Sequence, residues 1–330
     1  MKALKRIGRI FLIVAAILLI AALVVPFLVP VPPLDDTVPP QQLADSDSRY
    51  INIDGIDIHY KLYGQEEPAL LLLHGFPSNL FTWREVNPTL SEQYQVVSYD
   101  RPAFGLTDRP LEWQDDNPYS SSYQPQLALK LLDQLGIEQA VLVGNSAGGR
   151  IATEIALEHP ERVNALILVS PAIYGEGRPS LQQLFLRTPQ GKHLGVLLVR
   201  QIQEWGLELG KAAWHDPSKL TPEIWDGYTK PLKADNWDRA LLEFVLSGRS
   251  DSKISERLQE LTMPVLVITG DDDRIVPTSD SVRLASELPN AKLVIIPNCG
   301  HVPQEECPVE FSQAVKDFLS QIPIQIETLS

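Results

Sequence analysis

Residues 140–149 of this 330-residue chain read AVLVGNSAGG, and they give the clearest indication of its fold. Its apolar start predicts a short buried strand, and the next residues, RIATEIALE, carry apolar side chains at helical spacing. Between them lies a Gly-x-Ser-x-Gly pattern centred on Ser146. A strand, a sharp turn and a helix around this pattern predict a nucleophile elbow, whose strained turn lifts the serine hydroxyl clear of the sheet. We expect Gly144 and Gly148 to be required there, because a β-carbon would collide with the neighbouring strand or helix.

Strands and helices alternate on both sides of this elbow. The stretch 50–62 alternates around Asp54-Gly55 and predicts an antiparallel hairpin. Continuous apolar runs predict buried strands at 69–75, 95–100, 165–170, 264–270 and 292–297. Helices are expected near 82–90, 124–135, 281–288 and 308–319. The alternation predicts an α/β fold with a doubly wound, mostly parallel sheet.

The alternation stops between about residues 172 and 258. This segment is predicted to be helical, is rich in leucine and tryptophan, and is divided into short helices by prolines. Because it interrupts the sheet pattern, it predicts a helical cap inserted over the carboxyl edge of the strands, where substrate pockets form. Trp205 and Trp214 are the candidates to line that pocket.

The first 30 residues predict a membrane anchor. Residues 10–29 form an almost wholly apolar run, and at about 1.5 Å per residue such a run spans roughly the 30 Å core of a bilayer. A cleaved signal peptide is the alternative, but no small-x-small cleavage pattern follows the run. All basic residues of the segment precede the run: Lys2, Lys5, Arg6 and Arg9. We therefore expect a single-pass protein with a cytoplasmic amino terminus and an extracytoplasmic (periplasmic or lumenal) catalytic domain.

Residues 31–48 are proline-rich and predict a stiff, extended, solvated linker, which leaves 49–330 as the folded domain. The net charge of −14 argues against nucleic acid as a partner, because no basic face is available for phosphates. Cys299 and Cys307 could form a disulfide in an oxidising compartment or remain unpaired thiols, and the sequence slightly favours the thiols. We expect no cofactor and no metal.

Three side chains are candidates for nucleophilic catalysis. A serine hydroxyl needs a base, usually an imidazole that a carboxylate orients. His301 follows the predicted strand 292–297 and so falls on the carboxyl edge of the sheet, level with Ser146. The carboxylate should lie between them in sequence, after another strand, where three aspartates occur at 271–273. We choose Asp273, because the following Val276-Pro277 fixes the start of the next helix; Asp271 and Asp272 are expected in a solvated loop or as helix caps.

An oxyanion formed during acyl transfer also needs donors. The backbone N–H of Ala147, directly after the nucleophile, is one candidate. The loop after the first parallel strand reads HGFP at 74–77, and the N–H of Phe76 is the second candidate because Pro77 has no N–H to donate.

From about Arg49 onward, the chain resembles an α/β-hydrolase with a helical cap. Four motifs match that superfamily in order: HGFP at 74–77, DRPAFG at 100–105, GNSAG at 144–148, and the pair Asp273 and His301. The first two motifs resemble the branch that contains epoxide hydrolases and haloalkane dehalogenases. Those relatives use an aspartate nucleophile, and this chain has Ser146 instead. The departure implies acyl chemistry on an ester, thioester or amide.

The resemblance implies a serine hydrolase that cleaves carboxylic esters, including lipid acyl esters, through an acyl-enzyme on Ser146. Membrane-anchored esterases and monoacylglycerol lipases combine the same N-terminal span, serine elbow and apolar cap. The GNS sequence at 144–146 also resembles the carbon–carbon bond hydrolases of aromatic breakdown, called meta-cleavage hydrolases, which remain the alternative. A cofactor-free perhydrolase or an acyltransferase would use the same three residues. The expected partners are a small-molecule or lipid ester and the membrane.

Overall fold

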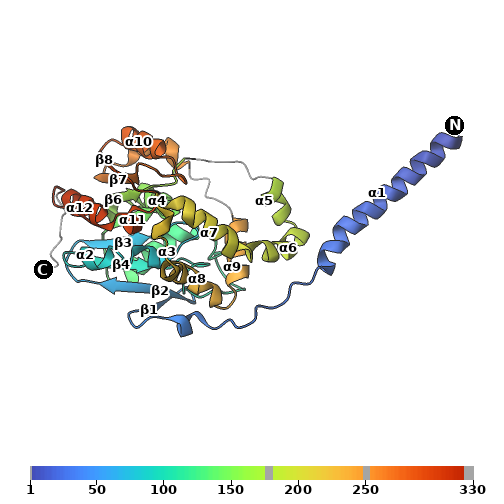
Figure 1. Ribbon diagram of the computed structural model, residues 1–330, viewed down its shortest axis with the longest axis horizontal. Coiled ribbons are helices and arrows are strands. Elements are labelled where there is room, and N and C mark those ends of the chain that lie inside the picture. Colours follow the sequence, from blue (N-terminus) through green and yellow to red (C-terminus); the bar gives the residue numbers. More distant parts are fainter. Residues whose placement is uncertain (1, 175–180, 248–252, 323–330) are drawn as a thin grey trace.

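The computed structural model describes residues 2–174, 181–247 and 253–322, and within them one eight-stranded sheet forms the centre of the molecule (Figure 1). The strands are β1 (Arg49–Ile53), β2 (Ile56–Tyr63), β3 (Ala69–Leu73), β4 (Gln95–Tyr99), β5 (Ala140–Asn145), β6 (Val163–Val169), β7 (Val265–Gly270) and β8 (Ala291–Ile296). Their order is β1-β2-β4-β3-β5-β6-β7-β8, and all pairs from β4 to β8 are parallel. The predicted hairpin and the mostly parallel sheet are confirmed.

Helices cover both faces of the sheet because the central strands are apolar on both sides. Along β3, Leu71 and Leu73 pack into one core cluster, and the alternating residues Leu70 and Leu72 pack into the other. One cluster is closed by α3 (Tyr123–Gln134), α4 (Ala147–Glu158) and α10 (Thr278–Glu287). The other is closed by α2 (Asn87–Leu90) and α12 (Pro308–Leu319). The elbow strand β5 is buried along its whole length.

The helical cap lies between β6 and β7, as expected. Its helices are α5 (Leu181–Leu186), α6 (Pro189–Val199), α7 (Ile202–Ala213), α8 (Pro222–Thr229) and α9 (Trp237–Ser247). Proline begins α6 and α8, where the missing N–H costs no hydrogen bond, and the preceding threonine side chains cap both helices. The cap has its own core, built around Trp237 and Leu241 of α9 and Val196 of α6.

The first helix, α1 (Lys2–Leu28), extends away from the domain (Figure 1). Within Lys5–Leu28, the most apolar window of 18 residues has a mean hydropathy of 3.2 and none of it is buried, so this helix is long and apolar enough to cross a membrane. Its carboxyl end contacts α6: the Gln190 side chain donates to the Leu23 carbonyl oxygen at 3.1 Å. The His193 ring nitrogen Nε2 also lies 2.8 Å from the Val29 carbonyl oxygen.

The linker predicted at 31–48 is largely exposed, and it also packs on the domain at several points. The backbone N–H of Val38 donates to Lys233 at 3.0 Å, and Asp235 donates back to Val38 at 2.9 Å. The Asp45 carboxylate pairs with Lys61 at 3.0 Å and with Lys230 at 2.6 Å. Composition indicated an extended chain, but it could not reveal that the chain follows a surface that offers these partners.

The prediction of a single helix at 82–90 is wrong. The structure has a 3₁₀ turn at Leu80–Trp83 and the four-residue helix α2 instead. The Asn79 side chain caps the turn by accepting from the N–H of Phe81. Pro88 lies in the first turn of α2, because a proline is tolerated there but not in the interior of a longer helix. The other predicted helices and strands agree with the structure within a few residues.

Candidate active site

The elbow has the strained geometry that its sequence predicts. Ser146 lies between the last residue of β5 and the first residue of α4, with φ 52° and ψ −114°. Its backbone N–H donates to the Val169 carbonyl oxygen at 2.9 Å, which fixes the turn against β6. A β-carbon on Gly144 would collide with the backbone of Gly148, and one on Gly148 would collide with the Leu73 carbonyl. The positive φ of Ser146 is a strained backbone conformation, which costs about 1–3 kcal/mol and is typical of functional sites.

His301 and Asp273 form a buried pair at the same edge of the sheet. The Nδ1 atom of His301 lies 2.8 Å from Oδ2 and 3.0 Å from Oδ1 of Asp273. The N–H groups of Ile275 and Val276 both donate to Oδ1 at 2.9 Å, so the carboxylate is held in one orientation. This arrangement keeps the proton of a neutral His301 on Nδ1 and leaves Nε2 able to accept one.

The two neighbouring aspartates have other partners. Asp272 lies 2.9 Å from Nδ1 of His215 and also pairs with Arg274, which lowers the pKa of its carboxyl group. Asp271 accepts the backbone N–H of Cys299 at 3.3 Å. The structure therefore places Asp273, and neither of the other two, against the His301 ring.

A buried glutamate, which the sequence did not single out, holds the loop that carries His301. Glu306 accepts the N–H of Gly300 at 2.7 Å and that of His215 at 2.9 Å, and so joins this loop to the cap. The N–H of His301 itself donates to the Ala213 carbonyl at the end of α7. Cys299 and Cys307 form a disulfide with Cα atoms 6.4 Å apart, whereas the sequence slightly favoured free thiols.

The HGFP loop lies beside Ser146 and is held by a buried arginine. The Arg101 side chain donates to the carbonyl oxygens of His74 at 3.1 Å and Gly75 at 3.0 Å. Burial, and next the charge of Arg101, lower the pKa of His74 to about 3, so this histidine is neutral and shapes the turn. An added β-carbon on Gly75 would lie 3.1 Å from Cβ of Ser146, which shows how closely the loop approaches the nucleophile.

The two expected oxyanion donors flank Ser146. Ala147 is the first residue of α4, where a backbone N–H has no partner within the helix and faces outward from its positive end. Phe76 follows Gly75 in the adjacent loop, and its ring packs on Phe104 and Phe244. These N–H groups remain predicted oxyanion donors.

Asn145 connects the elbow to the histidine loop. Its side-chain amide donates to the carbonyl oxygens of Val169 and His301, both at 3.2 Å. The sequence placed this residue next to the nucleophile but gave no sign of its partners, because both belong to other strands and loops. Buried as it is, the amide fixes the separation between β5 and the His301 loop.

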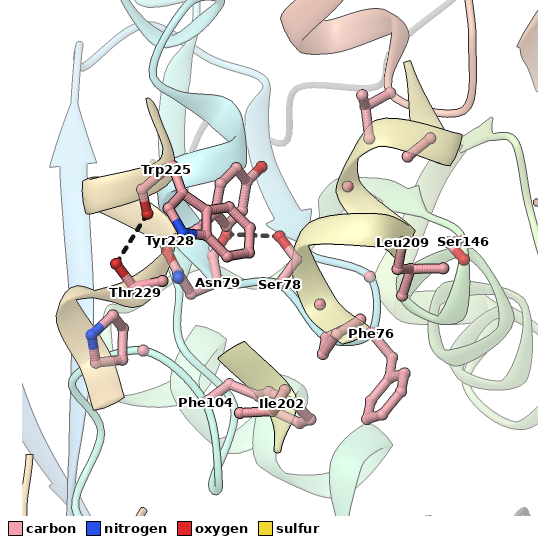
Figure 2. Close-up of a pocket in the computed structure, with 18 of the residues that line it drawn as sticks. Phe76, Ser78, Asn79, Phe104, Ser146, Ile202, Leu209, Trp225, Tyr228 and Thr229 are labelled. Carbon is pink, nitrogen blue, oxygen red and sulfur yellow. Dashed lines mark hydrogen bonds between the residues drawn. The ribbon is translucent and has the colours of Figure 1, made fainter. Parts of the chain in front are cut away.

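A cavity of about 140 Å³ lies between the sheet edge and the cap, and Ser146 and His301 both line it. Figure 2 shows Leu209 of α7, Trp225 and Tyr228 of α8, and Phe76 and Phe104 of the core domain around it. Most of the lining is apolar, which suits a small, largely apolar substrate.

The two predicted pocket tryptophans have different positions. Trp214, directly after α7, is 4% exposed and lines the cavity. Trp205 lies within α7, is 38% exposed and is not part of the lining, so its prediction is wrong. The two tryptophans are nine positions apart, and at about 100° per residue they are separated by about half a turn around the axis of α7. In the described parts of the chain, no group of three or more His, Cys, Asp or Glu side chains is arranged to bind a metal.

Comparison with known protein families agrees with this geometry. The family model for the alpha/beta hydrolase fold matches residues 68–308. The chain belongs to the alpha/beta hydrolase family. Its elbow, the histidine loop and the cap all lie within the matched region.

Two relatives match the hydrolase over nearly their whole length. The uncharacterized hydrolase YugF of Bacillus subtilis (strain 168) is 30% identical over 285 residues, which cover 84% of this chain and 99% of YugF. A 2-hydroxy-6-oxononadienedioate/2-hydroxy-6-oxononatrienedioate hydrolase of Paraburkholderia phymatum is 31% identical over 307 residues, which cover 87% of this chain and 100% of that protein.

A solved structure is similar in the same way. The meta-cleavage product hydrolase CumD of Pseudomonas fluorescens IP01 is 26% identical with a TM-score of 0.61, and the match covers 83% of this chain and 97% of CumD. The epoxide hydrolase CorEH has a higher TM-score, 0.69, but is only 19% identical and therefore shows the fold alone.

Proposed function

We propose that the hydrolase cleaves the carbon–carbon bond next to a ketone in substrates of the 2-hydroxy-6-oxodienoate type, through an acyl-enzyme on Ser146. This was the alternative in the sequence analysis, where ester cleavage came first. The observation that carries the proposal is the constellation at one sheet edge: strained Ser146 and buried His301 line one cavity, and Asp273 orients the histidine. The names of the relatives supply the substrate type.

The first half of the reaction uses this constellation directly. Nε2 of His301 accepts the Ser146 proton as Oγ attacks the ketone carbon, and Asp273 stabilises the resulting imidazolium. The N–H groups of Ala147 and Phe76 donate to the oxyanion of the tetrahedral intermediate. When the intermediate collapses, the carbon–carbon bond breaks and its electron pair leaves with the dienoate fragment. Before this step the proton of the C2 hydroxyl must move to C5, which gives the keto tautomer with a C3=C4 double bond. The electron pair then spreads from C5 through that double bond to the C2 oxygen.

The second half regenerates the enzyme. His301 returns its proton to the leaving fragment, then accepts a proton from water, which attacks the acyl carbon on Ser146. The products are a carboxylic acid and the 2-hydroxydienoate, so one water is consumed for each bond broken.

Cleavage of small carboxylic esters is a second candidate function. It needs the same acyl-enzyme, with an alcohol in place of the carbon leaving group. The apolar lining, with Trp214 and Trp225, favours an ester with an apolar acyl chain.

A direct comparison of substrates tests the proposal. The full chain in detergent is given 2-hydroxy-6-oxo-6-phenylhexa-2,4-dienoate, whose loss is followed by its conjugated absorbance, and p-nitrophenyl butyrate. We expect kcat/KM at least about tenfold higher for the dienoate, a difference of about 1.4 kcal/mol in transition-state stabilisation. If the wild-type enzyme consumed the dienoate no faster than Ser146→Ala, the carbon–carbon proposal would be wrong, and turnover of the ester would leave the second candidate.

We also propose that α1 anchors the enzyme in a membrane, with the amino terminus in the cytoplasm and the catalytic domain outside. The length and hydropathy of residues 5–28 support this, as do the basic residues before the apolar run. The contact between α1 and α6 would hold the cap near the bilayer surface. Exposed apolar side chains on α5 and α6 would then face the lipid: Leu184, Phe185 and Leu198.

A further inference from the structure

One edge of the cap lies against the carboxyl end of α1. This cap edge consists of residues 184–200, from the last part of α5 through α6. The Gln190 side chain donates to the Leu23 carbonyl oxygen at 3.1 Å, and the His193 ring lies 5.5 Å from the Phe27 ring. Figure 1 shows α5 and α6 on the side of the domain nearest to α1.

The contact at Leu23 fixes how deep the cap edge reaches when α1 spans a bilayer. The apolar span Lys5–Leu28 has 24 residues. At about 1.5 Å per residue it is roughly 36 Å long, only about 6 Å longer than the roughly 30 Å hydrocarbon core. Leu23 lies five residues before the end of α1, which is roughly 7 Å along the helix axis. Leu23 therefore lies near the boundary between acyl chains and headgroups, and the Gln190 side chain reaches the same depth.

Apolar side chains are exposed on this edge. Leu184 is 49% exposed and Phe185 is 46% exposed, and both come only a few positions before Gln190. Leu198, near the other end of α6, is 46% exposed. Single exposed apolar side chains are ordinary on a protein surface, but at the depth of a membrane interface acyl chains would remove them from water.

The charge of the cap edge is opposite to that of the chain as a whole. Its sequence, LFLRTPQGKHLGVLLVR, contains three Lys or Arg residues and no Asp or Glu, whereas the chain carries a net charge of −14. Arg200 pairs with Asp238 at 2.8 Å. Arg187 is exposed and has no ion pair within the described parts of the chain, and the Lys192 ammonium, on a side chain that is 53% exposed, comes only within 3.9 Å of Glu243. Two cations therefore remain available to an anionic partner.

We propose that the cap edge binds the surface of an anionic phospholipid bilayer. Leu184 and Phe185 insert between the lipids at the headgroup boundary, and Arg187 and Lys192 bind lipid phosphates and anionic headgroups beside them. The inference rests on the proposed anchor and adds the class of lipid that the domain binds. A bilayer fits both observations, because it offers an apolar phase and a negative surface at the depth that the contact with Leu23 sets.

This binding would also hold one wall of the active-site cavity. Val196 of α6 packs in the core of the cap with Trp237 and Leu241 of α9. Both of these α9 residues line the cavity. A lipid-bound cap edge therefore places the cavity beside the bilayer, where apolar substrates concentrate.

The first test measures the depth of the cap edge in a membrane. The full chain is reconstituted in nanodiscs of phosphatidylcholine alone or of an equal mixture with phosphatidylglycerol. Because both native cysteines are joined in a disulfide, Leu184→Cys accepts a single nitrobenzoxadiazole label. Lipids that carry a nitroxide near the headgroup should quench this label at least about twofold in the mixed lipids. The matched control, Val282→Cys on α10, replaces a side chain that is 42% exposed and should show no quenching.

The second test concerns the two cations. The label on Leu184→Cys is measured again in a chain that also carries Arg187→Gln and Lys192→Gln. In the mixed lipids, the ratio of docked to undocked label should fall roughly fivefold for each charge removed, as expected for basic side chains near an anionic surface. In phosphatidylcholine alone the ratio should hardly change. The control pair is Arg257→Gln with Arg283→Gln, which removes two cations outside the cap edge and should leave the ratio unchanged.

The outcomes separate this inference from the proposed function. No quenching at position 184 in a chain that is retained in nanodiscs, equal quenching with and without phosphatidylglycerol, or an unchanged ratio in the double variant would overturn it. A label that is shielded in detergent as the protein concentration rises would assign the edge to a second copy of the chain instead. A chain that elutes free of nanodiscs would refute the proposed anchor and this inference with it. None of these measurements involves turnover, so a failure of the carbon–carbon reaction would not alter them.

Discussion

The substitution Asp273→Asn tests the catalytic pair in the most detail, because the structure fixes how the new amide must lie. The N–H groups of Ile275 and Val276 both donate to Oδ1. Only the amide oxygen can accept them, so the amide NH₂ takes the place of Oδ2, 2.8 Å from Nδ1 of His301. The NH₂ then donates to Nδ1, which moves the histidine proton to Nε2 and removes the base that Ser146 needs.

The expected loss follows from two contributions. The His301 tautomer with its proton on Nδ1 loses its charge-assisted hydrogen bond to the Asp273 carboxylate, which costs about 1.5–3 kcal/mol. The imidazolium loses a carboxylate charge about 4 Å away, at about 4 kcal/mol for an effective dielectric constant near 20. Together they amount to about 5.5–7 kcal/mol, or a fall in kcat of about 10⁴- to 10⁵-fold.

The assay measures kcat with the dienoate and with p-nitrophenyl butyrate, alongside near-ultraviolet circular dichroism to verify folding. The matched control is Asp272→Asn, which alters a half-exposed carboxylate bound to Arg274 and His215 and should change kcat less than about threefold. A folded Asp273→Asn variant with near-wild-type kcat, or a larger loss in Asp272→Asn, would refute the reasoning.

Three further predictions follow from the structure. His74 is held neutral with a pKa of about 3, whereas in the unfolded chain it binds a proton as the pH falls below about 6.5. The free energy of unfolding should therefore drop by about 2 kcal/mol more between pH 7 and pH 5 in the wild type than in His74→Gln. Urea titrations that show the same drop in both proteins would mean that His74 is solvated. Reducing the Cys299–Cys307 disulfide, which links residues eight positions apart, should lower that free energy by about 2.5 kcal/mol, and an unchanged urea midpoint in dithiothreitol would contradict the pairing. Full-length protein should resist extraction from membranes by carbonate, with the domain open to protease from outside; a protected domain would reverse the proposed orientation.

Local patterns in the sequence predicted those parts of the structure that neighbouring residues determine. The elbow at Ser146 follows from the strand before it, the glycines around it and the helix after it, and His301 follows from its place after β8. Alternation of apolar runs and helical periods predicted the parallel sheet in the same way. Each of these features depends on residues within a few positions of one another.

The remaining features depend on partners that are distant in sequence. Asn145 and Glu306 matter because they meet carbonyls and N–H groups of other loops. The packing of 31–48 on the domain and the outward position of Trp205 belong to the same class. Residue type and spacing predicted none of these, because burial and pairing there are properties of the assembled fold.

The central claim, an acyl-enzyme formed by carbon–carbon cleavage on Ser146, is tested most directly by rapid quenching. Wild-type protein mixed with excess 2-hydroxy-6-oxo-6-phenylhexa-2,4-dienoate is denatured in acid within the first turnover and digested, and its peptides are analysed by mass spectrometry. The account predicts a benzoyl group on the peptide that contains Ser146, released 2-hydroxypentadienoate in equal amount, and no adduct in Ser146→Ala. Consumption of the dienoate with no benzoyl adduct at any quench time, or with the adduct on another residue, would contradict it.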